Sequence, residues 1–399
     1  MEVSLVFLIA GSIILIGFMG GLAFERTRIP DVLVLLSIGV FLGPVLKLVE
    51  PSTLTHFAEY FGMFALMVIL FEGGMDIDID RLIKEFGTAS LLVLISFFLS
   101  SIAIAVFLYF VQGWEIVRSL LLGTILGCTS AAIVIPIINK MSLKEGIKTL
   151  LSIESALSDV LAVVFTISLI EFVKFEKIGI QAPFRAVASS FSIALVSGTA
   201  AGLLWLKVLD FFRGRRYSYM TTLAAMLIIF AVVDFFGGSG PIAILLFGII
   251  LGNTNDLSKL LKLKVNTLID ETIKFFHGEV TFFIRTFFFV YMGMMLTFTS
   301  MNLQFLAFIF SIAAIIILIR YISVAITGMV FHEKKEDKFI LLTMMPRGLA
   351  SAVLATLPVS ANIKGSENFI DYTFGIIIIT NVLMTVGVFI AEKKSQVKP

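Results

Sequence analysis

The chain has 399 residues, of which 59% are hydrophobic and only 15% are charged, so its polar surface is too small to cover a soluble globular protein. The net charge of +2 gives no indication of a nucleic-acid partner, and the composition implies no soluble partner either. The single cysteine, Cys128, excludes a disulfide within one chain. These features predict a protein whose surroundings are the lipid bilayer.

Apolar segments follow one another along nearly the whole sequence, and roughly 20 apolar residues are needed to cross the hydrocarbon core of a bilayer. We therefore predict an all-α polytopic membrane protein with thirteen transmembrane helices. In chain order, the predicted spans lie at 3–24, 31–49, 57–72, 88–111, 117–139, 149–173, 185–212, 218–236, 239–252, 267–297, 302–331, 338–361 and 369–391.

Lysine and arginine residues are concentrated in alternate loops between these spans, as at Lys140, Lys144 and Lys148 and in the tail at Lys393 and Lys394. Cationic loops stay in the cytoplasm, so the N-terminus is expected outside and the C-terminus inside. We expect a multi-pass protein of a prokaryotic cell (inner) membrane.

The fifth and twelfth predicted spans differ from the others, because both are rich in small residues and interrupted by proline: GTILGCTSAAIVIP and MMPRGLASAVLATLP. Each contains Gly-x-x-Ser-Ala, at Gly127 to Ala131 and at Gly348 to Ala352, and the two spans cross in opposite directions. This pattern is typical of inverted repeats in which two broken helices cross near the bilayer midplane. Close packing of small residues is the simpler explanation of the match.

The sixth predicted span contains SIESALSDVLAVV, in which Ser155 and Asp159 are four residues apart and share one helical face. Glu154 and Ser158 form the neighbouring stripe. A charged group in the middle of a span costs at least about 2.5 kcal/mol, so Asp159 is a functional candidate. The alternative is that Asp159 only hydrogen-bonds to a neighbouring helix.

A carboxylate in a low-dielectric cavity is disfavoured in its charged form, so it can hold either a proton or a cation. If both compete for the same oxygens, entry of the cation expels the proton. A hard cation such as Na⁺ prefers oxygen ligands, which Asp159, Ser155, Thr129, Ser130 and Ser158 can supply. No resident cofactor is expected.

Arg347 lies in the interrupted twelfth span and cannot lose its proton, so it needs an anionic partner. We predict that Glu154 is this partner and that the pair locks the two broken spans together. The alternative is an arginine near the membrane interface that extends its head to water.

Other charged residues in or near the spans are possible secondary site residues. Glu72 ends the third predicted span just before an acidic stretch, for which a solvated loop is favoured over a cytoplasmic funnel that attracts cations. For the others we expect partners on other helices and mainly structural roles: Asp234, Glu279, Arg285 and Arg320.

Several motifs occur in a fixed order: RIPDVLVLLSIGVFLGP, LFEGGMDIDI, ESALSD, FFFVYMGMML and MPRGLASAVLA. In this combination the chain resembles the NhaP-like antiporters of the monovalent cation:proton antiporter superfamily over essentially its whole length. The resemblance implies a homodimer of thirteen-span protomers in which a core domain carries the ion by an elevator-like movement. We expect the core at about 57–173 and 302–391 and the dimerisation domain at about 1–56 and 185–297.

The resemblance also implies that Asp159 is the shared cation and proton site, that Ser155 and Thr129 help to coordinate the ion, and that Glu154 with Arg347 is a stabilising pair. Two departures stand out: Ser158 precedes Asp159 where many members have asparagine, and Ser130 follows Thr129 where many have aspartate. The second removes a carboxylate, which favours electroneutral exchange.

We therefore predict a secondary transporter, not an enzyme, that exchanges Na⁺, with Li⁺ also a candidate, for H⁺. K⁺/H⁺ exchange and a Kef-like potassium efflux system are the alternatives. An intramembrane protease is disfavoured, because the sequence has no His-Glu-x-x-His or Gly-x-Ser-x-Gly motif.

Overall fold

The structure is a computed structural model that describes residues 3–27, 30–47, 51–77, 79–141, 143–175, 181–211, 218–254, 257, 271–296, 302–331 and 335–396. Within these ranges the regular elements are all helical, as predicted. The helices are α1 (Val3–Thr27), α2 (Asp31–Val40), the π-helix η1 (Phe41–Val45), α3 (Pro51–Asp76), α4 (Ile79–Phe110), α5 (Ile116–Gly127), α6 (Ala131–Lys140), α7 (Glu145–Phe175), α8 (Gln181–Phe211), α9 (Ser218–Phe235), α10 (Gly240–Gly252), α12 (Glu271–Met294), α13 (Leu303–Phe331), α14 (Lys335–Thr343), α15 (Leu349–Ser360) and α16 (Phe369–Gln396).

Six helical segments in the described part of the chain are long and apolar enough to cross a bilayer by themselves, and five shorter apolar helices accompany them. The segment at Ile116–Lys140 spans both α5 and α6. The total of thirteen passes stays a prediction.

The chain forms two compact units. The first consists of Met1–Gly62, Gly87–Thr166 and Phe283–Pro399, and the second of Met63–Phe86 and Ile167–Phe282. In the second unit, small residues bring backbones close together: a methyl group at Gly198 would collide with the backbone of Ala243 on α10. The candidate site lies entirely in the first unit, so the following description concerns that unit.

Both interruptions predicted in the fifth and twelfth spans are present. The residues 128–130 separate α5 from α6 with extended backbone, and 344–348 separate α14 from α15. Pro346 lies within the second break, where it disfavours helical backbone at the residue before it. In the first break, Thr129 and Ser130 have hydroxyls that compete with the backbone for helical hydrogen bonds.

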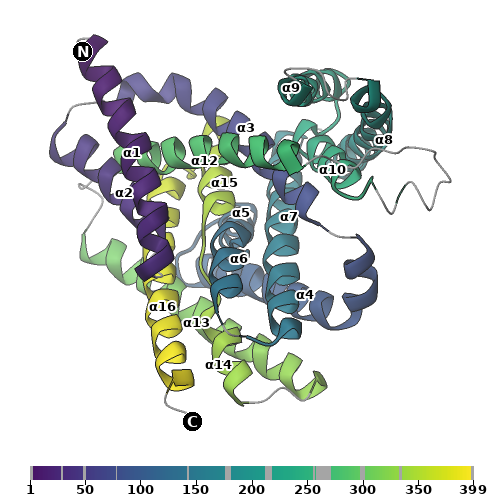
Figure 1. Ribbon diagram of the computed structural model, residues 1–399. Helices are drawn as coiled ribbons and strands as arrows, with labels where there is room; N and C mark the ends of the chain where they lie inside the picture. The colour runs from purple at the N-terminus through teal and green to yellow at the C-terminus, as the bar shows by residue number, and fades with distance from the viewer. Residues whose placement is uncertain are drawn as a thin grey trace. The chain divides into compact units, whose positions relative to one another are not determined.

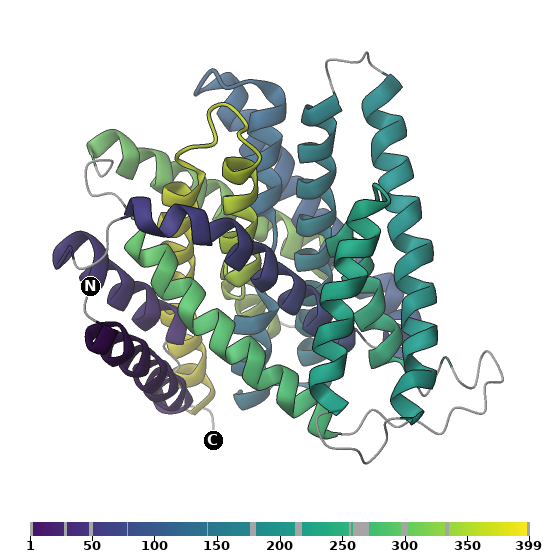
Figure 2. The ribbon, with the colours of Figure 1, turned by 90° about the horizontal axis from the view of Figure 1, so that it is seen from above.

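The half-helices α5 and α6 follow each other end to end, and α15 packs beside α5 (Figure 1). The view from above shows the same neighbours (Figure 2). On another side, α5 lies close to α4. Glycine makes this contact possible, because a methyl group at Gly123 of α5 would collide with the Ser101 carbonyl of α4.

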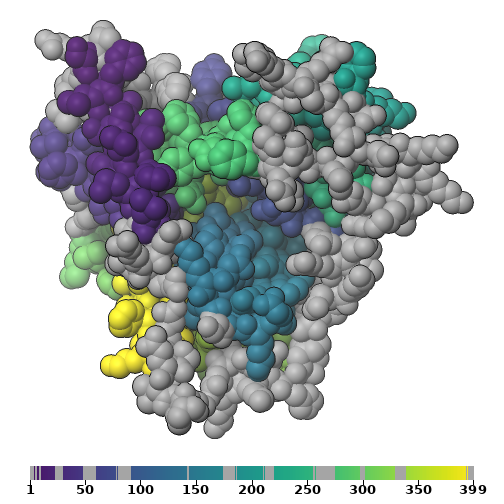
Figure 3. Space-filling model, in the orientation of Figure 1, coloured from purple at the N-terminus to yellow at the C-terminus, as the bar shows by residue number. Residues whose placement is uncertain are grey.

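The helix α1 carries large apolar side chains that are exposed, among them Leu8, Leu15, Phe18 and Met19 (Figure 3, purple). α1 packs against α2. An exposed apolar helix face is expected where lipid replaces water as the solvent.

Candidate functional site

The two non-helical segments meet. The Ser130 N–H donates to the Pro346 carbonyl at 2.9 Å, and a methyl group at Gly348 would collide with the Ser130 hydroxyl. In the other direction, the Cys128 thiol lies 3.3 Å from the Ser351 hydroxyl. The serine of each Gly-x-x-Ser-Ala motif therefore contacts the break of the other motif, as expected for two crossing broken helices.

Asp159 of α7 faces this crossing. Its Oδ2 accepts the Ala131 N–H at 3.1 Å, at the first residue of α6, where the helix dipole favours negative charge. Its Oδ1 is buried and has no hydrogen-bond partner among the described residues. Buried polar atoms are normally paired, so an unpaired carboxylate oxygen indicates a place for a proton or a ligand.

Ser158 and Thr129 connect α7 to the break between α5 and α6. The Thr129 N–H donates to the Ser158 Oγ at 3.0 Å, and this hydroxyl lies 3.2 Å from the Thr129 carbonyl. Ser155, one turn before Asp159, is also buried, and its hydroxyl donates to the Ser152 carbonyl of its own helix at 3.2 Å. The structure thus brings Asp159, Ser158, Thr129 and Ser130 together, whereas the Ser155 hydroxyl is held by its own helix.

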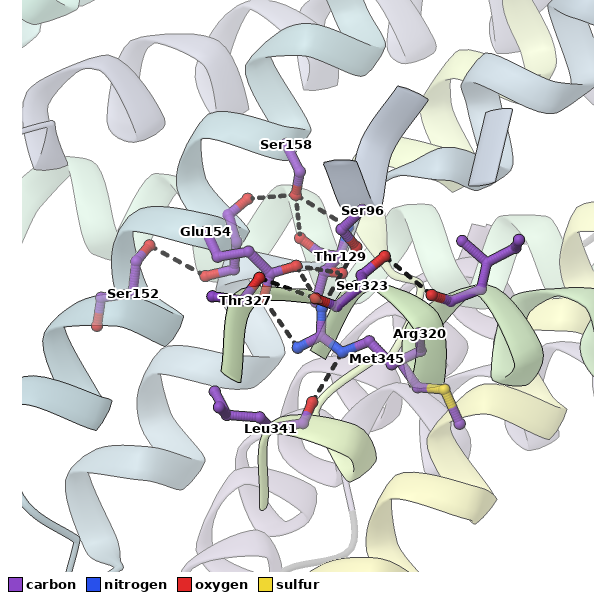
Figure 4. A network of polar contacts seen from close by, with 12 residues as sticks. Ser96, Thr129, Ser152, Glu154, Ser158, Arg320, Ser323, Thr327, Leu341 and Met345 are labelled. Carbon is purple, nitrogen blue, oxygen red and sulfur yellow. Dashed lines mark hydrogen bonds and ion pairs between the residues drawn. The ribbon is translucent and has the colours of Figure 1, made fainter. Parts of the chain in front are cut away.

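Glu154 forms a two-pronged ion pair with Arg320 of α13 (Figure 4). The Arg320 Nη1 lies 2.6 Å from Oε1 of Glu154 and Nη2 lies 3.0 Å from Oε2. Both side chains are buried: that of Arg320 is 3% exposed and that of Glu154 is 0% exposed. Arg320 also donates to the Leu341 carbonyl at 2.7 Å, and Thr129 donates to Glu154 at 3.3 Å. Both carboxylate oxygens of Glu154 and all three guanidinium nitrogens of Arg320 therefore have hydrogen-bond partners.

This geometry corrects the predicted partner of Glu154: the pairing of Glu154 with Arg347 is wrong. The Arg347 Nε donates to the Leu126 carbonyl at 2.8 Å and Nη1 to the Met345 carbonyl at 2.7 Å. The physical reason is that a helix leaves its last carbonyls without intrahelical donors, and Arg347 supplies cationic donors to the carbonyls beside both breaks. Arg347 does connect the two broken helices, but through hydrogen bonds to backbone carbonyls and not through an ion pair with Glu154.

Arg347 is 2% exposed, so it does not extend to water as the alternative reading required. Its backbone is held by α16: the Arg347 N–H donates to the Thr380 hydroxyl at 3.1 Å, and the Asn381 amide donates to the Arg347 carbonyl at 2.8 Å. Asn381 is fully buried in the middle of an apolar helix.

The sequence analysis missed three of these contact residues: Ser351, Thr380 and Asn381. For Asn381, the cost of a polar side chain in the middle of a span is the signal in the sequence that could have identified it.

Of the other charged candidates, Arg285 belongs to the first unit, and Glu72, Asp234 and Glu279 belong to the second. Arg285 pairs with Asp31 at 2.6 Å, which joins α12 to α2. Glu72 is half-buried in α3, whereas Asp234 and Glu279 are exposed. Arg320 and Arg285 thus take structural partners on other helices, as expected.

Comparisons with known proteins agree with this architecture. The family model described as sodium/hydrogen exchanger, transmembrane, matches residues 11–393. The chain is 26% identical to the K(+)/H(+) antiporter NhaP of Alkalimonas amylolytica, covering 95% of this chain and 65% of that protein. It is 23% identical to the K(+)/H(+) antiporter NhaP2 of Shewanella oneidensis, covering 94% and 64%. The chain therefore spans about 65% of the length of these relatives.

Among solved structures, the sodium proton antiporter MjNhaP1 from Methanocaldococcus jannaschii at pH 8 superposes with a TM-score of 0.77. The sequence identity is 22%, and the match covers 98% of this chain and 96% of that one, which establishes the fold. Because the family model matches nearly the whole chain, the protein belongs to the sodium/hydrogen exchanger family of multi-pass transmembrane proteins.

Proposed function

We propose that this protein exchanges a monovalent cation for a proton across a prokaryotic cell membrane, and that Asp159 binds both in turn. The observation that carries this proposal is the state of the two carboxylate oxygens. Oδ2 is fixed on the Ala131 N–H, while Oδ1 is buried, unpaired among the described residues, and next to the crossing. One oxygen orients the group and the other is free for chemistry.

Competition for Oδ1 couples the two ions. When Asp159 is protonated, its carboxyl group is neutral and holds no cation. When it loses the proton, the carboxylate needs a positive partner in a low-dielectric environment, and a monovalent cation supplies one. We propose that hydroxyl or carbonyl oxygens of nearby residues complete the ligand set of the cation: Thr129, Ser130, Ser155 and Ser158.

The charges around Asp159 support a carrier that moves as a body. Glu154 and Arg320 neutralise each other, and Arg347 donates hydrogen bonds to the Leu126 and Met345 carbonyls. The ion pair and Arg347 therefore need not change partners during a transport cycle. We propose that the segments at about 57–173 and 302–391 carry the ion by an elevator-type movement against a scaffold at about 1–56 and 185–297. A homodimer with the N-termini outside and the C-termini in the cytoplasm completes this proposal.

Na⁺ is our first candidate for the cation, with Li⁺ beside it, and K⁺ is the alternative. The names of the relatives support both, since two are called K(+)/H(+) antiporters and the structural match is called a sodium proton antiporter. A potassium efflux system is a further alternative. Ion selectivity depends on the number and field strength of the ligands, which the residue types alone do not fix.

The test is proton movement in proteoliposomes that contain the purified protein and a pH-sensitive dye. Addition of Na⁺, K⁺ or Li⁺ in turn should release protons with at least one of them, and the preferred ion identifies the substrate. Asp159→Asn should abolish the signal. Proton movement that is the same with all cations and with choline would exclude the proposal.

A further inference from the structure

An aromatic and cationic cluster lies at the ends of α5 and α15 that are remote from the crossing. Trp114 lies two residues before the start of α5, and Arg118 lies in the first turn of this helix. The Arg118 Cζ stands 3.7 Å from the centroid of the Trp114 ring, which is a close cation–π contact. The cluster does not include Asp159 or any of the proposed cation ligands.

Gly365, in the loop between α15 and α16, lies close against the Arg118 guanidinium. Its φ of +81° is a left-handed conformation that favours glycine. A Cβ at this position would lie 2.6 Å from the Arg118 Cζ, so any side chain would displace the guanidinium. The backbone conformation favours glycine here, and a side chain would also move the Arg118 guanidinium from its present position.

Glu367 holds this loop in place. Its Oε1 accepts the Gly365 N–H at 3.1 Å. Hydrogen bonds from its own backbone N–H and from Gly365 keep the pKa of the Glu367 carboxyl below its ordinary value. The loop conformation that presents Gly365 to Arg118 is thus stabilised locally.

Trp114 is itself anchored. Its ring stacks on Phe369, the first residue of α16, with an interplanar angle of 9° and centroids 6.1 Å apart. Phe308 of α13 and Tyr372 of α16 pack on the same ring at 5.7 and 5.9 Å. Large aromatic surfaces in contact favour one relative position of these helices.

The half-helix α5 is consequently attached to the neighbourhood of α15 at both ends. At the inner end, Arg347 donates to the Leu126 carbonyl, and Cys128 contacts Ser351. At the remote end, the Arg118 guanidinium is close to both Trp114 and Gly365. Two attachments remove the freedom of α5 to slide or rotate against α15, a freedom that one attachment would leave.

We propose that Trp114, Arg118 and Gly365 form a clamp of positioning residues that keeps α5 in register with α15, so that the crossing is preorganised for its cation. The inference rests on the proposed cation/proton exchange and adds residues that act on the site through α5. If the clamp is loosened, residues 128–130 can move relative to Gly348. This movement weakens cation binding, although no clamp residue contacts the ion.

The first test compares the cation KM and the maximal rate per folded transporter in proteoliposomes. Gly365→Ala, Arg118→Gln and Trp114→Leu should each raise KM roughly three- to ten-fold, with a smaller change in maximal rate. Arg118→Lys should restore much of the affinity, because it keeps a cation over the ring. Lys364→Gln, an exposed neighbour in the same loop, is the matched control and should leave KM unchanged.

A contact that only stabilises the fold would lower the melting temperature and the amount of folded protein without changing KM. That pattern in all three variants would overturn the proposal. Cation-induced stabilisation of the purified variants against heat gives the same comparison without transport. A wild-type protein that neither exchanges nor binds any tested cation would instead refute the proposed function, and the clamp's role with it.

The second test asks whether the clamp opens during the cycle. Cysteines at Glu115, just before α5, and at Lys364, in the loop that contains Gly365, are both at exposed positions and can be joined with a short bifunctional thiosulfonate reagent. The native Cys128 is 1% exposed, and wild-type protein treated with the reagent is the control for it. Joined protein should keep its exchange activity. Loss of activity on joining and recovery on reduction would show a gate, contrary to a fixed clamp.

Discussion

Glu154 and Arg320 form a two-pronged, fully buried ion pair although 166 positions separate them in the chain. The pair joins α7, which carries Asp159, to α13. Removing two charges from water is costly, and the cost is recovered only when the geometry is good and the remaining donors and acceptors are also satisfied. Leu341, Ser96 and Thr129 supply those further partners. The network therefore favours one arrangement of the helices around the site.

The first prediction concerns this pair. Glu154→Gln or Arg320→Gln alone should lower the stability by about 3–5 kcal/mol, because the remaining partner becomes an uncompensated buried charge. The double variant should lose less than the sum of the two. Denaturation of the three purified variants in detergent measures this coupling. As a control, Glu154→Gln combined with Arg347→Gln should show weaker coupling, because Arg347 donates to carbonyls and Glu154 pairs with Arg320; coupling as strong as that of Glu154 with Arg320 would contradict the assigned partners.

Arg347 should be sensitive to shape as well as to charge. Arg347→Gln leaves the Leu126 and Met345 carbonyls short of donors, at about 1–3 kcal/mol for each buried group. Arg347→Lys should recover only part of the loss, since an ammonium cannot reproduce the forked donors of a guanidinium. Thermal unfolding of both variants is the measurement, and full stability of Arg347→Lys would argue against the fork.

Asp159→Asn should abolish cation-driven proton movement while the protein stays folded. The amide oxygen can still accept the Ala131 N–H, but the side chain can neither release a proton nor balance a cation. Ser155→Ala should be milder and raise the apparent KM for the cation. Asp234→Asn, which changes an exposed carboxylate, is the matched control and should behave as wild type. Persistent cation-dependent exchange by folded Asp159→Asn would rule out the central assignment.

Gly348→Ala tests the crossing by sterics alone. The added methyl group collides with the Ser130 hydroxyl, so we expect a loss of about 1–3 kcal/mol of stability together with impaired exchange. Gly146→Ala is the comparison, because a methyl group there meets nothing within 4 Å and replaces glycine in a helix. This variant should be as stable as wild type or up to about 1 kcal/mol more stable. Equal effects of the two substitutions would count against the close contact.

Exchange should be electroneutral. If Asp159 carries either one proton or one monovalent cation, both loaded forms have the same charge, whatever fixed charges Arg347, Arg320 and Glu154 contribute. A membrane potential should then leave the cation-driven proton flux unchanged, whereas one uncompensated charge would couple by about 2.3 kcal/mol per 100 mV. Proteoliposomes clamped with valinomycin provide the measurement. A clear voltage dependence would show that a second titrating group takes part.

The sequence by itself determined the membrane class, the approximate positions of the helices and the two breaks. These features follow from local chemistry: apolar length sets a span, and proline, glycine and hydroxyl side chains interrupt a helix. It also singled out Asp159, because a carboxylate in the middle of a span is costly enough to stand out in any single sequence.

Only the tertiary structure decided which charges meet. The sequence predicts Glu154 as the partner of Arg347 from opposite charge alone, but Arg320 is also an arginine in a span, and the pairing depends on which helices are neighbours. Packing places Arg320 of α13 against Glu154, and Arg347 binds the carbonyls of Leu126 and Met345. The clamp of Trp114, Arg118 and Gly365 was hidden for the same reason: its members belong to loops and helix ends far apart in the chain, and contact between distant segments leaves no periodic signal in one sequence.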